Sequence, residues 1–307
     1  MLPSVTFVVP VYNAAQAIRH CLVSVLRQRE ISLRLIVIDH GSSDDTPALV
    51  RDFATRHPDV GLVSLARTVA DRRSPARPLN EGLNRALSMP GAHFDRSWVY
   101  RLDADDFLVS DDVVATTLRE GGYRELVMGT LVFFDARARS AYDYGPVRSQ
   151  RSLRGLVGRG VYAVAHHATA MRLDLLQQAT SRRPLYDETL ETGEDLGATC
   201  RLVRALDGDE SRFSFVERPY CYKALSDTSI TGSLPLWRVL AAHRTLLREH
   251  PELAPFAVAR GLAELALTRL VGESLARRSL QHLAGRNGEY QPVAFASVER
   301  RKRELER

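Results

Sequence analysis

The sequence predicts an α/β fold in which a mainly parallel sheet is flanked by helices, and two observations lead to this prediction. In the first hundred residues, short apolar runs alternate with segments whose apolar side chains recur at helical spacing. The apolar runs are continuous, as expected of parallel strands that are covered on both faces. Residues from 234 onward are predicted to be mostly helical and to form a C-terminal extension.

The elements of the first hundred residues follow in order. We predict a helix capped by Asn13, a second helix capped by Ser42 or Ser43, and a third near residues 79–86. Strands precede and separate these helices, and they are predicted at 5–9, 33–38, 60–65 and 98–102. Further along the chain, β segments are expected at 126–134 and 161–165, a helix from Asp174, and another helical stretch after the acidic segment 188–195.

Polar residues follow three of the predicted strands directly. Ligands bind at the carboxyl ends of parallel strands, so these residues are expected to meet at one edge of the sheet. They are Tyr12 and Asn13, then Asp39 and His40, then Asp103, Asp105 and Asp106. Carboxylates in a turn can hold sugar hydroxyls or a hard cation such as Mg²⁺. Taken alone, the acidic turn equally indicates a loop before a helix; its combination with the other strand ends makes it a candidate site.

Composition excludes several classes of function. The formal net charge is +5, but aromatic residues make up only 7% and no basic stripe is interleaved with them, so no nucleic-acid partner is expected. No run of eighteen apolar residues exists, so no transmembrane segment is expected, and the N-terminus lacks the features of a signal peptide. Three widely spaced cysteines predict reduced thiols and a cytoplasmic protein.

Five segments, taken together, carry a resemblance to a known family. They occur in this order: VVPVYN (8–13), IVIDHGSSDDT (36–46), ARPLNEGLNRA (76–86), YRLDADDFL (100–108) and TGEDLGATCRL (192–202). The set resembles the inverting family-two glycosyltransferases with the GT-A fold, over roughly residues 4–230. The resemblance implies a glycosyltransferase domain over 1–232, with a nucleotide-binding half (1–110) and an acceptor half (111–232), followed by a helical region over 233–307.

The resemblance also implies the roles of residues on the donor side. The substrate would be a nucleoside-diphosphate sugar, with Mn²⁺ or Mg²⁺ bridging its diphosphate. Asp103 would hold the ribose, and Asp105, together with Asp103, would bind the metal. An arginine before Asn80 normally touches the nucleotide, and Arg73 and Arg77 compete for that role. The remaining positions assigned to the donor are Pro10, Val11, Tyr12, Asp39, His40, Ala104 and Lys223.

The catalytic acids implied by the resemblance are Glu194 and Asp195, with Asp195 as the general base. A base must lie within hydrogen-bond reach of the acceptor hydroxyl, and a metal stabilises charge on the leaving diphosphate. The transition state is oxocarbenium-like. Both acids also suit the first turn of a helix for purely structural reasons.

His40 stands where the family usually has a second carboxylate. Neutral histidine can accept a hydrogen bond with one ring nitrogen and donate with the other. Uridine diphosphate is therefore the first expectation for the nucleotide, with thymidine and guanosine diphosphates as alternatives. His166 and His167 come at the end of the predicted β segment and are poorly spaced as a metal pair, since neighbouring side chains on a strand point to opposite faces, which favours structural or acceptor contacts.

The segment from Tyr220 through Thr231 resembles the family's late loop, without the histidine often found there. Two other functions remain open. A sugar-phosphate nucleotidyltransferase is disfavoured because the first loop lacks a Gly-rich Arg-Lys signature, and a degenerate, non-catalytic partner subunit is disfavoured by the retained aspartates. The acceptor can be a saccharide, a lipid-linked saccharide, a natural product or a protein. The C-terminal helices leave peripheral membrane contact and homo-oligomer formation open.

Overall fold

The computed structural model describes residues 2–67, 74–144, 152–153, 155, 166–225, 234–251, 253 and 290–307. Its strands all join one sheet. They are β1 (Ser4–Val11), β2 (Ser32–Asp39), β3 (Val60–Ser64), β4 (Ser97–Arg101), β5 (Phe107–Leu108), β6 (Leu126–Asp135), β7 (Ser140–Tyr144), β8 (Thr169–Arg172), β9 (Phe213–Ala224) and β10 (Tyr290–Val293). The sheet order is β10-β7-β6-β8-β4-β1-β2-β3, with β9 beside β6 and β5 beside β9.

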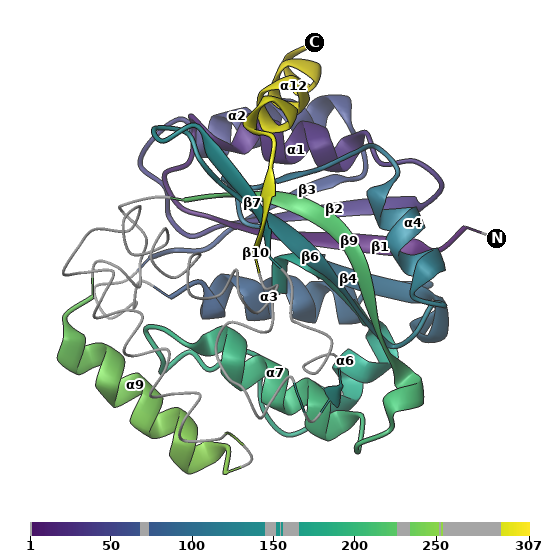
Figure 1. Cartoon of the computed structure of the whole chain (residues 1–307), viewed down its shortest axis with the longest axis vertical. Helices are drawn as coiled ribbons and strands as arrows, with labels where there is room; N and C mark the ends of the chain where they lie inside the picture. Colours follow the sequence, from purple (N-terminus) through teal and green to yellow (C-terminus); the bar gives the residue numbers. More distant parts are fainter. Residues whose placement is uncertain are drawn as a thin grey trace.

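Helices cover both faces of this sheet (Figure 1). They are α1 (Ile18–Leu26), α2 (Thr46–Arg56), α3 (Ala76–Leu87), α4 (Val113–Glu120), α6 (Leu173–Thr180), α7 (Glu194–Ala205), α9 (Leu236–Glu249) and α12 (Phe295–Glu306). Helices α1 and α2 pack on one face, while α3, α6 and α7 pack on the other. The predicted α/β class is therefore confirmed.

The parallel part of the sheet positions the site. Strand β1 lies between β2 and β4 and runs parallel to both, with β3 parallel to β2 on the far side. The register pairs Val11 with Asp39 and Val8 with Arg101, so the carboxyl ends of β1, β2 and β4 lie at the same edge. Strands β6, β7 and β8 extend the sheet in antiparallel fashion.

Alternation along β1 builds the two halves of the core. Phe7 and Val9 face the layer of α1, and Val8 faces the layer of α3. Helix α3 approaches β1 closely because Gly82 has no side chain. A Cβ at that position would lie 2.2 Å from Cγ1 of Val8, well inside van der Waals contact.

Two predicted helix caps are wrong, for one physical reason. Helix α1 begins at Ile18 without a side-chain cap, and α2 begins at Thr46 after Asp45. The Asn13 side chain instead accepts a hydrogen bond from the backbone N–H of Ser43, at 2.8 Å. The loops after β1 and β2 therefore use their polar side chains to bind each other. The predicted β segment at 161–165, residues 254–289 of the predicted helical region and residues 229–231 of the late loop lie outside the described residues.

The C-terminal region contains a strand as well as helices. Strand β10 pairs antiparallel with β7 at the edge of the sheet. Helix α12 then packs against α1 (Figure 1), with Val298 and Leu305 buried. Arg301 donates hydrogen bonds to the carbonyl of Leu108 at 3.0 Å and to Asp111 at 2.7 Å. No helix in the described ranges is both long and apolar enough to cross a membrane.

Candidate functional site

The loops that follow β1 and β2 are tied into one surface. The hydroxyl of Ser42 accepts a hydrogen bond from the backbone N–H of Asn13 at 2.9 Å, and Asp39 accepts one from the N–H of Ser42 at 3.1 Å. Asn13 has a left-handed φ of 48°, a conformation that asparagine tolerates better than most residues. The side chain of Asp39 is thus held at the strand end where the sequence predicts nucleotide contacts.

Tyr12 is exposed beside this surface, and an arginine covers its ring. The guanidinium carbon of Arg67 lies 3.9 Å from the ring centroid, a cation–π contact. A side chain on Gly41 would collide with Cβ of Arg67 at 2.9 Å, so this glycine lets the loop after β3 approach. His40 is buried, with 6% of its surface exposed. Pro10 and Val11 are buried within β1.

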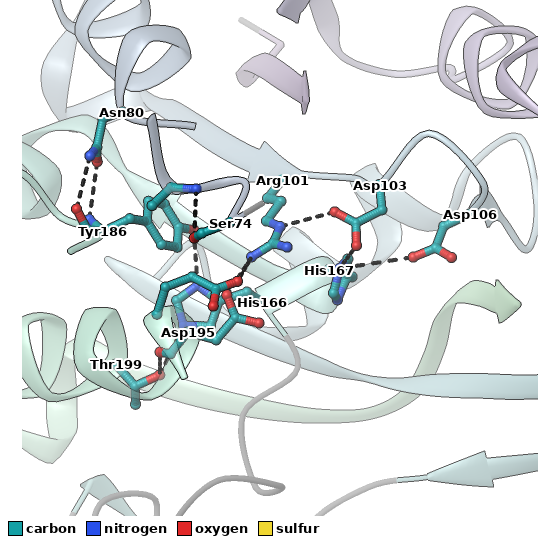
Figure 2. Close-up of polar contacts among 12 residues, drawn as sticks. Ser74, Asn80, Arg101, Asp103, Asp106, His166, His167, Tyr186, Asp195 and Thr199 are labelled. Carbon is teal, nitrogen blue, oxygen red and sulfur yellow. Dashed lines mark hydrogen bonds and ion pairs between the residues drawn. The ribbon is translucent and has the colours of Figure 1, made fainter. Parts of the chain in front are cut away.

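Two residues of α3 that the sequence assigns to the donor, an arginine and an asparagine, make contacts in different parts of the protein. Arg77 donates a hydrogen bond to the carbonyl of Ala66 at 3.4 Å, so it lies next to the loop that follows β3. Asn80 is buried, donating to the carbonyl of Tyr186 at 2.8 Å and accepting from the N–H of Tyr186 at 3.0 Å (Figure 2). Asn80 therefore holds the segment that precedes α7. Arg73 lies outside the described residues.

The acidic turn after β4 divides into exposed and buried carboxylates. Asp105 is exposed, and its side chain makes no hydrogen bond or ion pair with the part of the chain that the structure describes. Ala104 is buried in the core, and so is Asp106. The backbone N–H of Asp106 donates to the carbonyl of Asp103 at 3.1 Å, which closes the turn.

A lysine and a histidine line the inner side of this turn. Lys223 on β9 donates to Asp103 and to Asp106, both at 3.2 Å. Nε2 of His167 lies 2.6 Å from Oδ2 of Asp103 (Figure 2). Burial raises the pKa of the Asp106 carboxyl well above its usual value, with contributions from Asp105 and Asp103, although Lys223 opposes the rise.

The carboxylates and His167 can be compared with what a divalent cation requires. One ligand atom each from Asp103, Asp106 and His167 lies within 4.8 Å of the others, and oxygen and imidazole donors suit Mn²⁺. However, the ammonium of Lys223 already neutralises the inner carboxylates. Asp105 is the carboxylate of the turn that stays open to solvent, so the turn fits a hydrated cation held by Asp105.

Arg101 joins the acidic turn to the first turn of α7. Its side chain is 5% exposed, and its Nε donates to Asp103 at 3.1 Å. A terminal nitrogen of the same guanidinium donates to Asp195 (Figure 2). The same nitrogen lies 4.0 Å from a carboxylate oxygen of Glu194. One buried arginine thus binds the predicted ribose ligand and the predicted base together, using the forked geometry that arginine alone provides.

The environments of the two acids of α7 shift their pKa values in opposite directions. Burial would raise the pKa of Asp195, but the positive charge of Arg101, together with smaller contributions from His166 and His167, outweighs it, so the net shift is downward. Burial and the neighbouring Asp195 raise the pKa of Glu194 to about 7. Such a separation between neighbouring carboxyl groups is typical of sites that need one ionised and one protonated group.

His166 connects α7 to the segment that precedes it. Its ring nitrogens lie 3.0 Å from the hydroxyl of Tyr186 and 2.8 Å from that of Thr199 (Figure 2). The Thr199 hydroxyl in turn donates to the backbone carbonyl of Asp195 at 2.8 Å. Burial lowers the pKa of His166 to about 4, so the ring is neutral near neutral pH. His166 is therefore part of the framework that holds Asp195.

The sequence did not indicate the contacts made by Arg67 and Arg101, nor that His167 would contact Asp103. Arg101 precedes the aspartate-rich turn inside an apolar strand, and this position was a signal, because an arginine in a buried strand needs an acidic partner. The partner of Arg67 could not be found from sequence, since its contact with Tyr12 depends on how two loops approach each other.

Comparison with known proteins identifies relatives of this chain. A family model described as "Glycosyl transferase family 2" matches residues 6–178, more than half of the chain. The succinoglycan biosynthesis protein ExoO of Rhizobium meliloti (strain 1021) is 36% identical over 110 residues, which is 36% of this chain and 28% of that protein. A PGL/p-HBAD biosynthesis glycosyltransferase of Mycobacterium tuberculosis (strain ATCC 25177 / H37Ra) is 25% identical over 182 residues, 55% of this chain and 66% of that protein.

Solved structures share the fold at low sequence identity. Residues 1–349 of TarS from S. aureus, in complex with UDP-GlcNAc, match with a TM-score of 0.57 and 17% identity, over 88% of this chain and 72% of that one. The mannosyltransferase PcManGT from Pyrobaculum calidifontis, in complex with GDP-Man and Mn²⁺, matches with a TM-score of 0.55 and 20% identity, over 99% of this chain and 81% of that one. These likenesses confirm the GT-A fold.

Proposed function

The chain belongs to glycosyl transferase family 2, and from this premise we propose that it transfers a sugar from a nucleoside-diphosphate sugar to an acceptor hydroxyl with inversion at the anomeric carbon. The single observation that carries the proposal is the bond of Arg101 to both Asp103 and Asp195. A donor-binding carboxylate and a base must flank one reacting carbon, and one guanidinium can contact both only if they lie close together.

In this reaction Asp195 is the general base. It accepts the proton of the acceptor hydroxyl as the acceptor oxygen bonds to the anomeric carbon and the bond to the diphosphate breaks. The positive charge of Arg101 lowers the pKa of Asp195, and so it keeps the carboxylate ionised and able to accept a proton. Glu194, with a pKa of about 7, is the neighbouring acid that can stay protonated and donate a hydrogen bond to a sugar hydroxyl.

We assign the divalent cation, Mn²⁺ or Mg²⁺, to Asp105. When bound, such an ion stabilises the negative charge that develops on the leaving diphosphate. The exposure of Asp105 supports this assignment. So does the neutralisation of the inner carboxylates by Lys223, because it leaves the outer one for a cation from solvent. The PcManGT structure was solved with Mn²⁺, and its fold is the same.

We assign the nucleobase to the surface formed by Tyr12, Asp39 and His40, with Arg67 and Arg77 beside it. An aromatic ring stacks on a base, and a carboxylate accepts from a ring N–H. Uridine diphosphate remains the first choice and thymidine or guanosine diphosphate the alternatives. TarS binds UDP-GlcNAc and PcManGT binds GDP-Man, so the shared fold accommodates both uridine and guanosine nucleotides.

The acceptor is proposed to be a saccharide or a lipid-linked saccharide. The matching relatives take part in the biosynthesis of succinoglycan and of PGL/p-HBAD. We place the reaction in the cytoplasm, in keeping with three buried cysteines that form no disulfide.

A thermal-shift screen of uridine, thymidine and guanosine diphosphates, each with and without Mn²⁺ or Mg²⁺, tests the proposal. A ligand that binds only the folded chain raises the unfolding midpoint by mass action, so the correct nucleotide raises it in the presence of the metal. Hydrolysis or transfer from the corresponding nucleotide sugar then identifies the donor. Stabilisation by none of the three diphosphates contradicts the proposed function. Release of pyrophosphate from a sugar phosphate and a nucleoside triphosphate would show a nucleotidyltransferase instead.

A further inference from the structure

The outward face of α9 combines apolar and basic side chains. Trp237 and Leu240 are 65% and 46% exposed. The described residues contain three other exposed large hydrophobic side chains, and none of those lies within one helical turn of another. Ala241, Arg244 and Arg248 are also exposed. We call Trp237, Leu240, Ala241, Arg244 and Arg248 the α9 outer face.

The spacing of these residues makes one continuous stripe. Trp237, Ala241, Arg244 and Arg248 follow one another at intervals of four, three and four residues, so they line one side of the helix. Leu240 flanks the stripe on one side. The apolar side chains occupy the first turns of the helix and the two arginines the last turns.

The opposite side of α9 is fixed to the body of the protein. Val239, Ala242 and Leu246 are buried. The side chain of Leu246 lies against the start of α7, where a Cβ on Gly193 would approach it to 2.7 Å and one on Gly197 to 3.2 Å. The helix is therefore anchored by its inner side directly behind the turn that carries Asp195, and its outer face is left to solvent.

We propose that the α9 outer face docks on the surface of an anionic lipid bilayer. Helices that lie in the membrane interface carry Trp and Leu that enter the acyl boundary and Arg that contacts lipid phosphates. The arginines of this stripe suit such a surface, because guanidinium groups bind phosphate and their stems can lie along the apolar layer. The only acid in the last turn, Glu249, is turned toward Arg183, to which it is bound at 3.0 Å.

A second copy of this chain is a poorer occupant of the same face. A two-fold contact through the stripe would enclose Arg244 and Arg248 of both copies with no acid of the stripe to balance them, and like charges at an interface repel. An anionic bilayer complements them. Docking through α9 also places on the membrane the helix whose inner side packs against α7. The inference does not depend on the proposed transfer reaction, because membrane binding is measured without turnover.

Flotation of the full chain with vesicles tests the docking. The chain is expected to float with equimolar phosphatidylcholine and phosphatidylglycerol, to stay behind with phosphatidylcholine alone, and to be released as salt screens the charges. Arg244→Gln/Arg248→Gln should weaken partitioning about 30-fold. Trp237→Ser/Leu240→Ser should weaken it roughly tenfold or more.

The matched control is Arg300→Gln/Arg303→Gln, which removes the same charge from the exposed side of α12. This variant should float like the wild type. All four changed side chains in the α9 variants are exposed, so thermal midpoints should not move, and nucleotide-induced stabilisation should persist. Equal flotation of all variants, loss only in the α12 control, or equal binding to neutral vesicles would overturn the proposal. So would a wild-type dimer that Trp237→Ser converts to a monomer without any vesicle binding.

Discussion

Arg101 and Asp195 are 94 positions apart in the chain, yet the guanidinium of one donates directly to the carboxylate of the other. The first stands at the end of β4 and the second in the first turn of α7. The same guanidinium also bonds to Asp103. A single side chain therefore joins the acidic turn after β4 to α7, the helix that carries the proposed base.

Replacing Arg101 should therefore damage both folding and activity. Arg101→Met leaves Asp103 and Asp195 without their shared cation in a largely buried place, which should lower the free energy of unfolding by roughly 3 kcal/mol. Urea unfolding and initial rates measure the two effects. Arg101→Lys keeps the charge but not the fork, so it should recover most of the stability and little of the rate. Full activity in both variants would contradict the positioning role of Arg101.

Asp195→Asn and Glu194→Gln form a matched pair that separates the base from its neighbour. Loss of a general base costs about 10²- to 10⁴-fold in rate, so Asp195→Asn should lose transfer while it keeps nucleotide binding in the thermal-shift assay. Glu194→Gln preserves the protonated form of that group and should reduce kcat by a smaller factor. If Glu194→Gln is instead the variant that loses transfer, then Glu194 is the general base.

The raised pKa of Glu194 gives a pH dependence with a defined sign. A carboxyl group whose pKa rises on folding, here from 4.5 to about 7, binds its proton more tightly in the folded chain. Its contribution to stability therefore falls as pH rises across that window. Glu194→Gln removes the effect, so its stability advantage over the wild type should be roughly 2 kcal/mol larger at pH 8 than at pH 5. Urea titrations at both pH values measure this. Asp59→Asn, an exposed change in the turn before β3, should show no such change.

Asp105→Asn should abolish the metal-dependent part of nucleotide binding. The variant keeps the shape of the side chain but removes the charge that attracts a hard cation. Isothermal titration with Mn²⁺ and with nucleotide should show weak binding of both, and transfer should fall by roughly 100-fold or more. Asp59→Asn, an exposed change in the turn before β3, serves as control. If the wild type keeps its activity in the presence of a chelator, the metal assignment is wrong.

His40→Asp tests whether the histidine selects the nucleobase. A carboxylate at this buried strand end can accept a hydrogen bond from the ring N–H of uracil, so the variant should bind uridine diphosphate as well as the wild type does, or better. Competition among the three diphosphates measures this. A change of preferred base in the variant would show that His40 sets the donor.

The main features of the fold followed from local patterns, and the electrostatic contacts of the site did not. Continuous apolar runs with polar residues behind them correctly placed Tyr12, Asp39 and Asp103 at one edge, because parallel strands align their ends. The contacts of Asp103 with His167 and Lys223 depend on β8 and β9, whose pairing joins residues far apart in sequence. The cap assigned to Asn13 failed because that side chain has a non-local partner, which no single segment reveals.

The pairing of β10 with β7 has a consequence for how the protein is made. Strand β7 is complete once residue 144 has been synthesised, but its outer edge stays without a partner until residues 290–293 leave the ribosome. An open strand edge can pair with other chains and promotes aggregation. Messages truncated before Tyr290 should therefore yield insoluble chains even though every residue of the proposed active site is present.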